Sequence, residues 1–232
     1  WHWFLTGSRF IRYTPAGVVT PRRLEGQLFA GGWVEGDIAF LAGADETNLM
    51  LVYAPRGSSA DGTRYLAAEP GATLTTPAEL AALQPDQQGT VRSLPVSPGR
   101  TVTTRTWQAT VLESRRGDAA WQAIKDANSA ARPAESGYEY VLAFVRLRYV
   151  NPAAGDNVGL TTGLLRVTGE RNVIYPAPAV PAPAPTPASF LYAGGETSGW
   201  VIGQAAAGEG RLLLVLQPSV MSDTARFLAL EE

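Results

Sequence analysis

Residues able to do acid–base, nucleophilic or metal chemistry are scarce in this chain. Among 232 residues there is one histidine, His2, and no cysteine. A Ser–His–Asp triad needs a firmly held imidazole, and His2 lies where a backbone tends to fray. No serine stands in a Gly-x-Ser-x-Gly turn. The sequence therefore predicts no serine or thiol hydrolysis, and the same inventory predicts no zinc or copper site.

Carboxylates are the remaining candidates for catalysis, and five of them stand around one predicted helix: Glu113, Asp118, Asp126, Glu135 and Glu139. A glycosidase needs two such groups on either side of a cleft. Arginines stand in the same stretch, so we interpret these carboxylates as a helix cap and solvated ion-pair partners. Asp156 and Asn157 provide far fewer oxygen ligands than calcium requires. We therefore predict no enzymatic activity, no cofactor and no bound metal.

Composition and charge restrict the classes of partner. The chain holds 45% hydrophobic and 17% charged residues, as folded globular proteins do. Its net charge of −2 provides no basic surface for nucleic acid or anionic lipid. No apolar run is long enough to predict a membrane span. The chain starts at Trp1 without a signal peptide, so we expect a processed or longer precursor, exported to the envelope or exterior. Any membrane anchor is expected outside residues 1–232.

Two stretches of the sequence match each other. Aligned without a gap, Leu28–Pro55 and Leu191–Pro218 share 12 identities in 28 positions. The match extends on both sides with a one-residue slip, which pairs Tyr13 with Tyr175. Internal repeats reveal the building unit of a chain. About 65 residues of the second unit precede its matched part and have no counterpart in the first, so we interpret the chain as half a domain followed by a complete one.

This interpretation divides the chain into three segments. Residues 1–70 are the C-terminal half of a first sandwich, 71–98 a linker rich in turn residues, and 99–232 a complete second sandwich. In the second, a helix is expected over Gly117–Asn128 with Asp118 as its N-cap. Alternating apolar residues predict strands over 101–114, 138–150, 159–167, 172–175, 199–204, 211–217 and 225–230.

About seven short strands with frequent turns and one short helix are typical of an immunoglobulin-type fold. We therefore predict an all-β, immunoglobulin-like antiparallel β-sandwich with one short helix, preceded by a partial second copy of the same sandwich. The proline-rich run 176–187 has the composition of a linker. The first stretch crosses the same interval with 14–21, so we place the run inside the domain as a stiff connection between strands. A ligand for an aromatic groove is the alternative.

Three stretches carry a resemblance to a known family: Trp107–Trp121, Gly137–Tyr149 and the glycine-rich run from Gly194 to Val201. Together they are similar to the telokin-like, immunoglobulin-fold domains of unknown function in secreted proteins and lipoproteins of bacteria. The resemblance covers about 99–232 and, as a C-terminal half, about 1–70. It implies an exported, non-enzymatic domain and supplies no catalytic residues.

Aromatic residues of the first unit are the candidates for an interface. Trp33 stands at a turn position where the second stretch has Glu196, and Trp1, Trp3 and Phe4 lie close together in sequence. If these side chains are exposed, they form an apolar patch of the kind that marks a binding surface. The alternative is that they pack within the first unit.

We therefore expect a non-catalytic extracellular structural or interaction subunit with protein partners or other copies of itself. A half sandwich exposes strand edges, and a neighbour that covers them would build a filament or sheath. The alternative is that residues upstream of Trp1 complete the first domain. Two other functions stay open: a solute- or ion-binding envelope lipoprotein, with a pocket lined by Tyr138, Tyr149 or Trp200, and an extracellular accessory subunit of a membrane complex.

Overall fold

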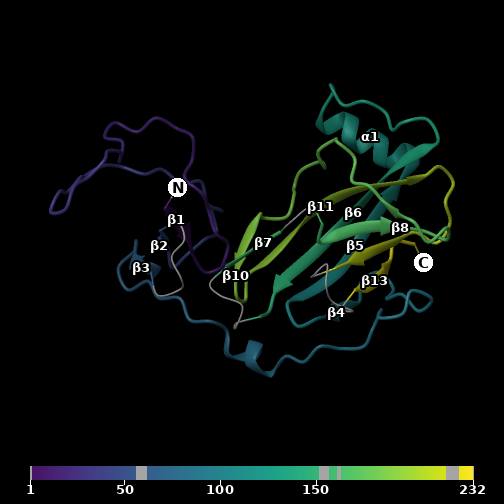
Figure 1. Ribbon diagram of the computed structural model, residues 1–232, viewed down its shortest axis with the longest axis horizontal. Coiled ribbons are helices and arrows are strands. Elements are labelled where there is room, and N and C mark those ends of the chain that lie inside the picture. Colours follow the sequence, from purple (N-terminus) through teal and green to yellow (C-terminus); the bar gives the residue numbers. More distant parts are fainter. Residues whose placement is uncertain (1, 56–61, 152–156, 161–162, 218–224, 232) are drawn as a thin grey trace. The chain divides into compact units, whose positions relative to one another are not determined.

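The computed structural model describes residues 2–55, 62–151, 157–160, 163–217 and 225–231 (Figure 1). It divides into two compact units, Trp1–Thr76 and Pro77–Glu232. The described residues form antiparallel sheets together with one α-helix, α1 (Gly117–Ala127). The all-β class predicted from the alternating strands is confirmed.

The second unit is a sandwich of two four-stranded sheets. One sheet has the order β11 (Glu196–Ala206), β6 (Tyr138–Tyr149), β5 (Trp107–Arg116) and β4 (Thr101–Thr103). The other has the order β13 (Arg226–Ala229), β12 (Leu213–Leu216), β8 (Leu165–Thr168) and β9 (Ile174–Tyr175). A separate pair is formed by β7 (Asn157–Gly159) and β10 (Phe190–Tyr192).

Every second residue of these strands enters the layer between the sheets, as the pleat requires. On β6 the buried residues Val141 and Val145 face this layer, and Val167 and Leu214 face it from the other sheet. At Gly203 of β11 a Cβ would collide with the Val167 side chain, so glycine is required for this close approach. Interdigitation of this kind is what holds two sheets together.

Helix α1 covers the opposite face of the β6 sheet (Figure 1). Ala120 and Ile124 of the helix form one buried cluster with Tyr140, Leu142 and Trp200 of the sheet. Because both of its faces are covered, the first half of β6 is apolar at successive positions, as expected for a central strand.

The strand expected over 101–114 is a hairpin of β4 and β5. The hydroxyl oxygen of Thr104 accepts hydrogen bonds from the backbone N–H groups of Thr106 and Trp107, at 3.2 and 2.8 Å. These bonds close a tight turn between two stretches of equally strand-like composition. The alternation of apolar and polar residues does not reveal a turn that is held by hydrogen bonds to one side chain.

The expected helix is present, but its predicted N-cap is wrong. The helix begins at Gly117 in the left-handed region, at φ 56°, and the N-cap residue is Arg116 in an extended conformation. Asp118 therefore lies in the first turn. Its negative charge is still favourable there, close to the positive end of the helix dipole.

Residues 71–98, expected as a linker, belong from Pro77 onward to the second unit. The N–H of Val96 donates to the carbonyl of Phe227 over 2.9 Å, and the N–H of Phe227 donates to the carbonyl of Gly89 over 2.8 Å. The stretch 89–96 therefore runs along β13 and covers its edge, which would otherwise expose unpaired backbone groups.

The proline-rich run lies within the second unit between β9 and β10, as expected. The N–H of Trp200 donates to the carbonyl of Pro185 over 2.7 Å. At Gly199 there is no room for a Cβ, because one would collide with the backbone of Thr186 and Pro187. The run therefore covers the outer edge of β11. Proline has no backbone N–H, but its carbonyl can accept a hydrogen bond from this edge.

The first unit contains a three-stranded antiparallel sheet of β1 (Trp3–Thr6), β2 (Met50–Tyr53) and β3 (Arg64–Ala67). Its register is that of the β8–β12–β13 sheet. Thr6 lies opposite Met50 as Thr168 lies opposite Leu213. The strands that pair are the same ones that the sequence match aligns.

Candidate functional site

The described residues hold no group of three or more His, Cys, Asp or Glu side chains that could bind a metal ion. Among the same residues, no helix is long and apolar enough to span a membrane. Of the carboxylates around α1, Glu113 forms an ion pair with Arg115 at 2.8 Å and Glu139 forms one with Arg116. These two are ion-pair partners of neighbouring arginines, as interpreted from the sequence.

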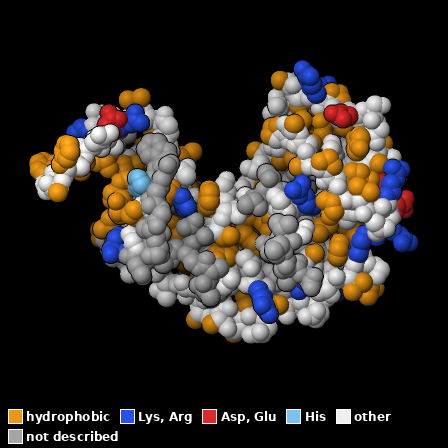
Figure 2. All heavy atoms as spheres, viewed as in Figure 1, with side chains coloured by type: hydrophobic (Ala, Val, Ile, Leu, Met, Phe, Trp, Pro, Cys, Tyr) orange, Lys and Arg blue, Asp and Glu red, His pale blue; other side chains and the backbone are white. Residues whose placement is uncertain are grey.

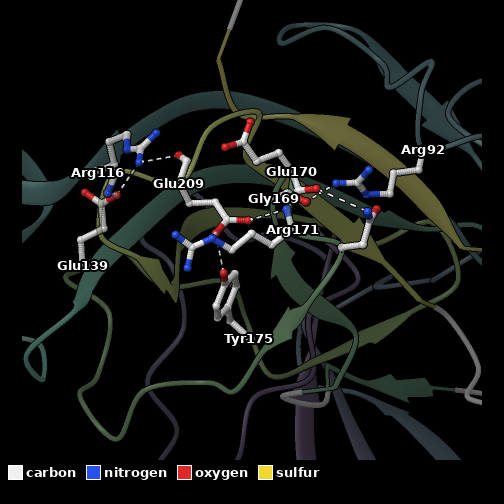
Figure 3. Close-up of polar contacts among 10 residues, drawn as sticks. Arg92, Arg116, Glu139, Gly169, Glu170, Arg171, Tyr175 and Glu209 are labelled. Carbon is white, nitrogen blue, oxygen red and sulfur yellow. Dashed lines mark hydrogen bonds and ion pairs between the residues drawn. The ribbon is translucent and has the colours of Figure 1, made fainter.

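A buried carboxylate, Glu209, connects two turns at one end of the second sandwich (Figure 3). The Tyr175 hydroxyl donates to its Oε2 over 2.5 Å, and the backbone N–H of Arg171 donates to its Oε1 over 2.9 Å. The Arg171 guanidinium adds an ion pair at 3.3 Å. We call this arrangement the Tyr–Glu clasp. A buried charge is tolerated because its oxygens are all engaged.

Two further arginines bond to the backbone around this clasp (Figure 3). Arg116 donates to the carbonyl of Glu209 over 2.7 Å, and Arg92 donates to the carbonyl of Gly169. Gly169 has no room for a Cβ, which would collide with the Glu209 side chain. The region is a structural junction between the β8–β9 and β11–β12 turns.

The pKa values within the clasp follow from burial and these bonds. Burial by itself raises the pKa of Glu209, but the Tyr175 and Arg171 hydrogen bonds and the nearby positive charges outweigh it and lower the pKa below its ordinary value. Burial, followed by the bond to Glu209, raises the pKa of Tyr175. The pKa of Glu209 is thus lowered and that of Tyr175 raised, so both lie further from neutral pH than usual. Both shifts favour an ionised carboxylate and a protonated phenol, which are the states that the hydrogen bond between them requires.

The first unit contains the same clasp. The Tyr13 hydroxyl donates to Glu46 Oε2 over 2.5 Å, and the N–H of Arg9 donates to Glu46 Oε1 over 2.7 Å. Burial first, and then the bond to Glu46, raises the pKa of Tyr13 to about 12. Tyr13 and Glu46 are the residues that the sequence match pairs with Tyr175 and Glu209.

The loop between β1 and β2 also follows its counterpart in the second unit. The N–H of Asp37 donates to the carbonyl of Arg22, as the N–H of Trp200 donates to that of Pro185. Asp37 and Trp200 occupy matching positions of the two stretches, and Arg22 and Pro185 precede them by the same number of residues. The backbone near Arg22 therefore lies beside Asp37 in the first unit, as the proline-rich run lies beside β11 in the second unit.

Apolar side chains are exposed along this loop. Val19 is 96% exposed, Phe29 92% and Trp33 80%, and Val18 and Leu28 are more than half exposed. We call these residues, together with Val34, the apolar loop; Figure 2 shows hydrophobic side chains on this part of the first unit. Exposed apolar groups that gather in one segment mark interaction sites in soluble proteins.

Charges around the apolar loop are balanced. Arg22 pairs with Glu35 at 2.9 Å and with Asp37 at 3.3 Å, and Arg23 pairs with Glu25 at 3.3 Å, all on the surface. Two positive and three negative side chains leave no basic field to attract phosphate groups. The charged side chains beside the apolar loop are thus engaged with one another in surface ion pairs.

The counterparts of Leu28 and Phe29 in the apolar loop are buried in the second unit. Leu28 and Phe29 match Leu191 and Tyr192, which are 0% and 7% exposed. Those residues belong to β10, and the run continues into β11, which pairs along its length with β6. Equivalent side chains are thus covered where partner strands are present and exposed in the first unit.

The predicted interface residues lie in different surroundings. Trp1 lies outside the described residues. The Trp3 ring lies 4.8 Å from that of Tyr53, centre to centre, whereas Phe4 is buried beneath the guanidinium of Arg12 at 3.5 Å. Successive residues of β1 point to opposite faces of the sheet, so Trp3 and Phe4 do not share one patch. Trp33 belongs to the apolar loop.

Sequence reasoning missed Phe29, the most exposed aromatic side chain among those described in the apolar loop. The signal was present in the internal match. Phe29 aligns with Tyr192 of β10, which lies opposite Asn157 of β7 in the second unit, whereas no strand lies opposite Phe29 among the described residues of the first unit. An aromatic residue whose pairing strand is missing is the expected site of exposure.

The second unit also contains a cavity of about 360 Å³ between the proline-rich run and the sheets. Its walls are apolar apart from Ser189, and include Leu147, Leu165, Pro178 and Val201. The residues expected to line a pocket, Tyr138, Tyr149 and Trp200, are not among its lining. Among the lining side chains, only the Ser189 hydroxyl could contact an ion.

No protein-family model matches the chain, and no curated protein matches it. Among solved structures, the chain is similar to a protein described as a "putative lipoprotein (ycdA)" from Bacillus subtilis subsp. subtilis strain 168, at 7% identity and a TM-score of 0.43. The likeness covers 56% of this chain and 38% of that protein, so it spans less than half of the latter's length. At these values the comparison assigns neither family nor function.

Proposed function

We propose that the chain is a non-catalytic structural or interaction subunit of the cell envelope or exterior, and that it binds another protein through the apolar loop. The observation that carries the proposal is the exposure of Phe29 and Trp33. Burying an aromatic or aliphatic side chain of this size stabilises by about 1.5–3 kcal/mol relative to exposure. A partner that covers the loop gains this free energy.

The telokin-like, immunoglobulin-type description is part of this proposal. Support comes from the two-sheet sandwich and from α1, which lies between β5 and β6 in the chain as in the stretches that carry the resemblance. The partial first copy is part of it too, supported by the shared strand register and the two Tyr–Glu clasps. An exported, non-enzymatic role is what that family implies.

Photo-crosslinking in the native cell tests this function. A photoreactive phenylalanine analogue is placed at Phe29 or Trp33 of the full chain, and the control position is Leu94, a 73% exposed residue of the second unit. We expect one discrete protein adduct, identified by mass spectrometry, from the two loop positions and none from Leu94. Equal adducts at all three positions, or none at the loop, would contradict the proposal.

A second candidate function rests on the cavity beneath the proline-rich run. Its volume of about 360 Å³ and apolar walls suit an acyl chain or a similar apolar solute, in an envelope lipoprotein that binds solutes. Ligands that bind only the folded state raise the melting temperature. Fatty acids of increasing length should therefore stabilise the chain, and Val201→Trp, which fills the cavity, should abolish the effect. Absence of any shift excludes this function.

A further inference from the structure

We infer that Leu28–Leu41 is an acceptor for an added β-strand, which another protein supplies and which has the alternating apolar pattern of β6. The inference rests on the proposed function and names the class of partner. Such β-augmentation combines backbone hydrogen bonds for affinity with alternate side chains for specificity.

The backbone of this segment has the path of β10 and β11 without their pairing. The turn at Gly31, with φ 84°, matches the turn at Gly194, with φ 96°. In the second unit β11 pairs with β6 at every position from Glu196 to Ala206. Between Leu28 and Leu41 the backbone forms only isolated bridges, at Asp37 and Phe40. The segment is therefore prepared for a strand partner that the described residues do not supply.

The sheet of the first unit has a face that would lie against such a partner. Leu51 and Leu66 are cross-strand neighbours on this face, and their counterparts are Leu214 and Leu228. The counterparts are 3% and 1% exposed, whereas Leu66 is 48% exposed and Leu51 is partly exposed. In the second unit this face is covered by the sheet that contains β6. One added strand would therefore complete the strand ladder of Leu28–Leu41 and lie against this face of the first unit.

The internal correspondence also gives the register of the added strand. In the second unit Thr197 lies opposite Leu147 and Val201 lies opposite Ala143. Transferred by the sequence match, Val34 would lie opposite a residue like Leu147, and Ile38 opposite a residue like Ala143. The occupant therefore needs apolar side chains at every second position, aimed at the exposed face of the sheet.

Strand β6 of a second copy of this chain is not available to fill this position. In the second unit β6 is paired on both sides, with β5 and with β11. The outer edges of that sheet are occupied too, by Pro185 along β11 and by Asp86 against Thr103 of β4. A second copy would have to open its own sandwich, at the cost of its buried core.

The test adds a synthetic peptide with the sequence Tyr138–Tyr149 to the full-length chain and follows amide hydrogen exchange. We expect the amides of 34–41 to exchange at least about tenfold more slowly with the peptide bound, since pairing protects backbone N–H groups. The control peptide carries proline in place of Val141 and Val145. The variant Ile38→Pro should lose the protection, and Val19→Ser, outside the predicted ladder, should keep it.

The outcomes separate this inference from the proposed function. If the peptide protects neither 34–41 nor the exposed face, strand addition is overturned. If the chain alone forms dimers in sedimentation with 34–41 protected, the occupant is a second copy and the inference is overturned as well. If Phe29 still forms a crosslinked adduct but the peptide gives no protection, the proposed interaction function stands and strand addition is overturned. If neither the adduct nor the protection is observed, both proposals are overturned.

Discussion

The hydroxyl of Tyr175 donates a 2.5 Å hydrogen bond to Oε2 of Glu209, a carboxylate whose side chain is completely buried. The bond connects β9 to the turn between β11 and β12, elements 34 residues apart in sequence. Without its partners the carboxylate would be an uncompensated buried charge. The position of this turn therefore depends on the tyrosine, and the same dependence holds for Tyr13 and Glu46.

Removing the hydroxyl of Tyr175 should destabilise the second unit. In Tyr175→Phe the ring is kept and one donor to Glu209 is lost, so we expect the free energy of unfolding to fall by about 1–3 kcal/mol. Urea denaturation followed by tryptophan fluorescence measures this change. Tyr138→Phe, at an exposed position, is the matched control and should change it by less than about 0.5 kcal/mol. Similar effects of both variants would show that the clasp contributes little.

Alkaline pH should weaken the first unit through Tyr13. Its pKa in the folded chain is raised from 10.0 to about 12, by burial and by Glu46. A raised pKa means that the folded state favours the protonated phenol, so the stability it contributes is complete below pH 10.0 and is lost as pH rises toward about 12. Ultraviolet absorbance of the phenolate should show one fewer late-titrating tyrosine in Tyr13→Phe than in the unchanged chain. A titration unchanged by this substitution would contradict the assignment.

A methyl group at Gly169 should disturb the Tyr–Glu clasp directly. In Gly169→Ala the new Cβ would collide with the Glu209 side chain, which cannot move without breaking its hydrogen bonds. We expect a loss of about 1–3 kcal/mol, typical of overpacking. Gly17→Ala is the control, because a Cβ there would meet no atom within 4 Å. Equal melting temperatures for the two variants would refute the steric argument.

Substitution on the apolar loop should leave folding intact and weaken binding. Phe29→Ser changes a side chain that is 92% exposed, so the free energy of unfolding should shift by less than about 0.5 kcal/mol. Affinity for the protein identified by crosslinking should fall at least about tenfold, as expected for an aromatic anchor. Leu94→Ser provides the matched apolar-to-polar control. An unchanged affinity in calorimetry would remove Phe29 from the interface.

Strands whose side chains alternate strictly were predictable from the sequence. Val145, Leu147 and Tyr149 alternate with Arg146 and Arg148, and this pattern predicts β6 because successive side chains of a strand face opposite environments. The hairpin of β4 and β5 was not predictable in this way. Its turn depends on bonds to the Thr104 hydroxyl, and threonine is equally common inside strands.

The candidate site was predictable only in part. Trp33 aligns with Glu196 in the internal sequence match, which indicates a turn and hence exposure. In the structure the Trp33 side chain is exposed. Trp3 and Phe4 are adjacent in sequence, but the pleat of β1 sends them to opposite faces. The surroundings of each then depend on residues elsewhere in the first unit, such as Tyr53 and Arg12.

The sequence by itself determined the class of fold, the presence of α1 and the positions that match between the two stretches, because these follow from local periodicity and direct comparison of residues. Only the tertiary structure decided that Tyr13 and Tyr175 close equivalent clasps on buried glutamates, and that Phe29 is exposed while Tyr192 is covered. Burial is a property of contacts between residues distant in the chain. Matching aromatic residues are therefore covered in one unit and exposed in the other, according to the strands that lie beside them.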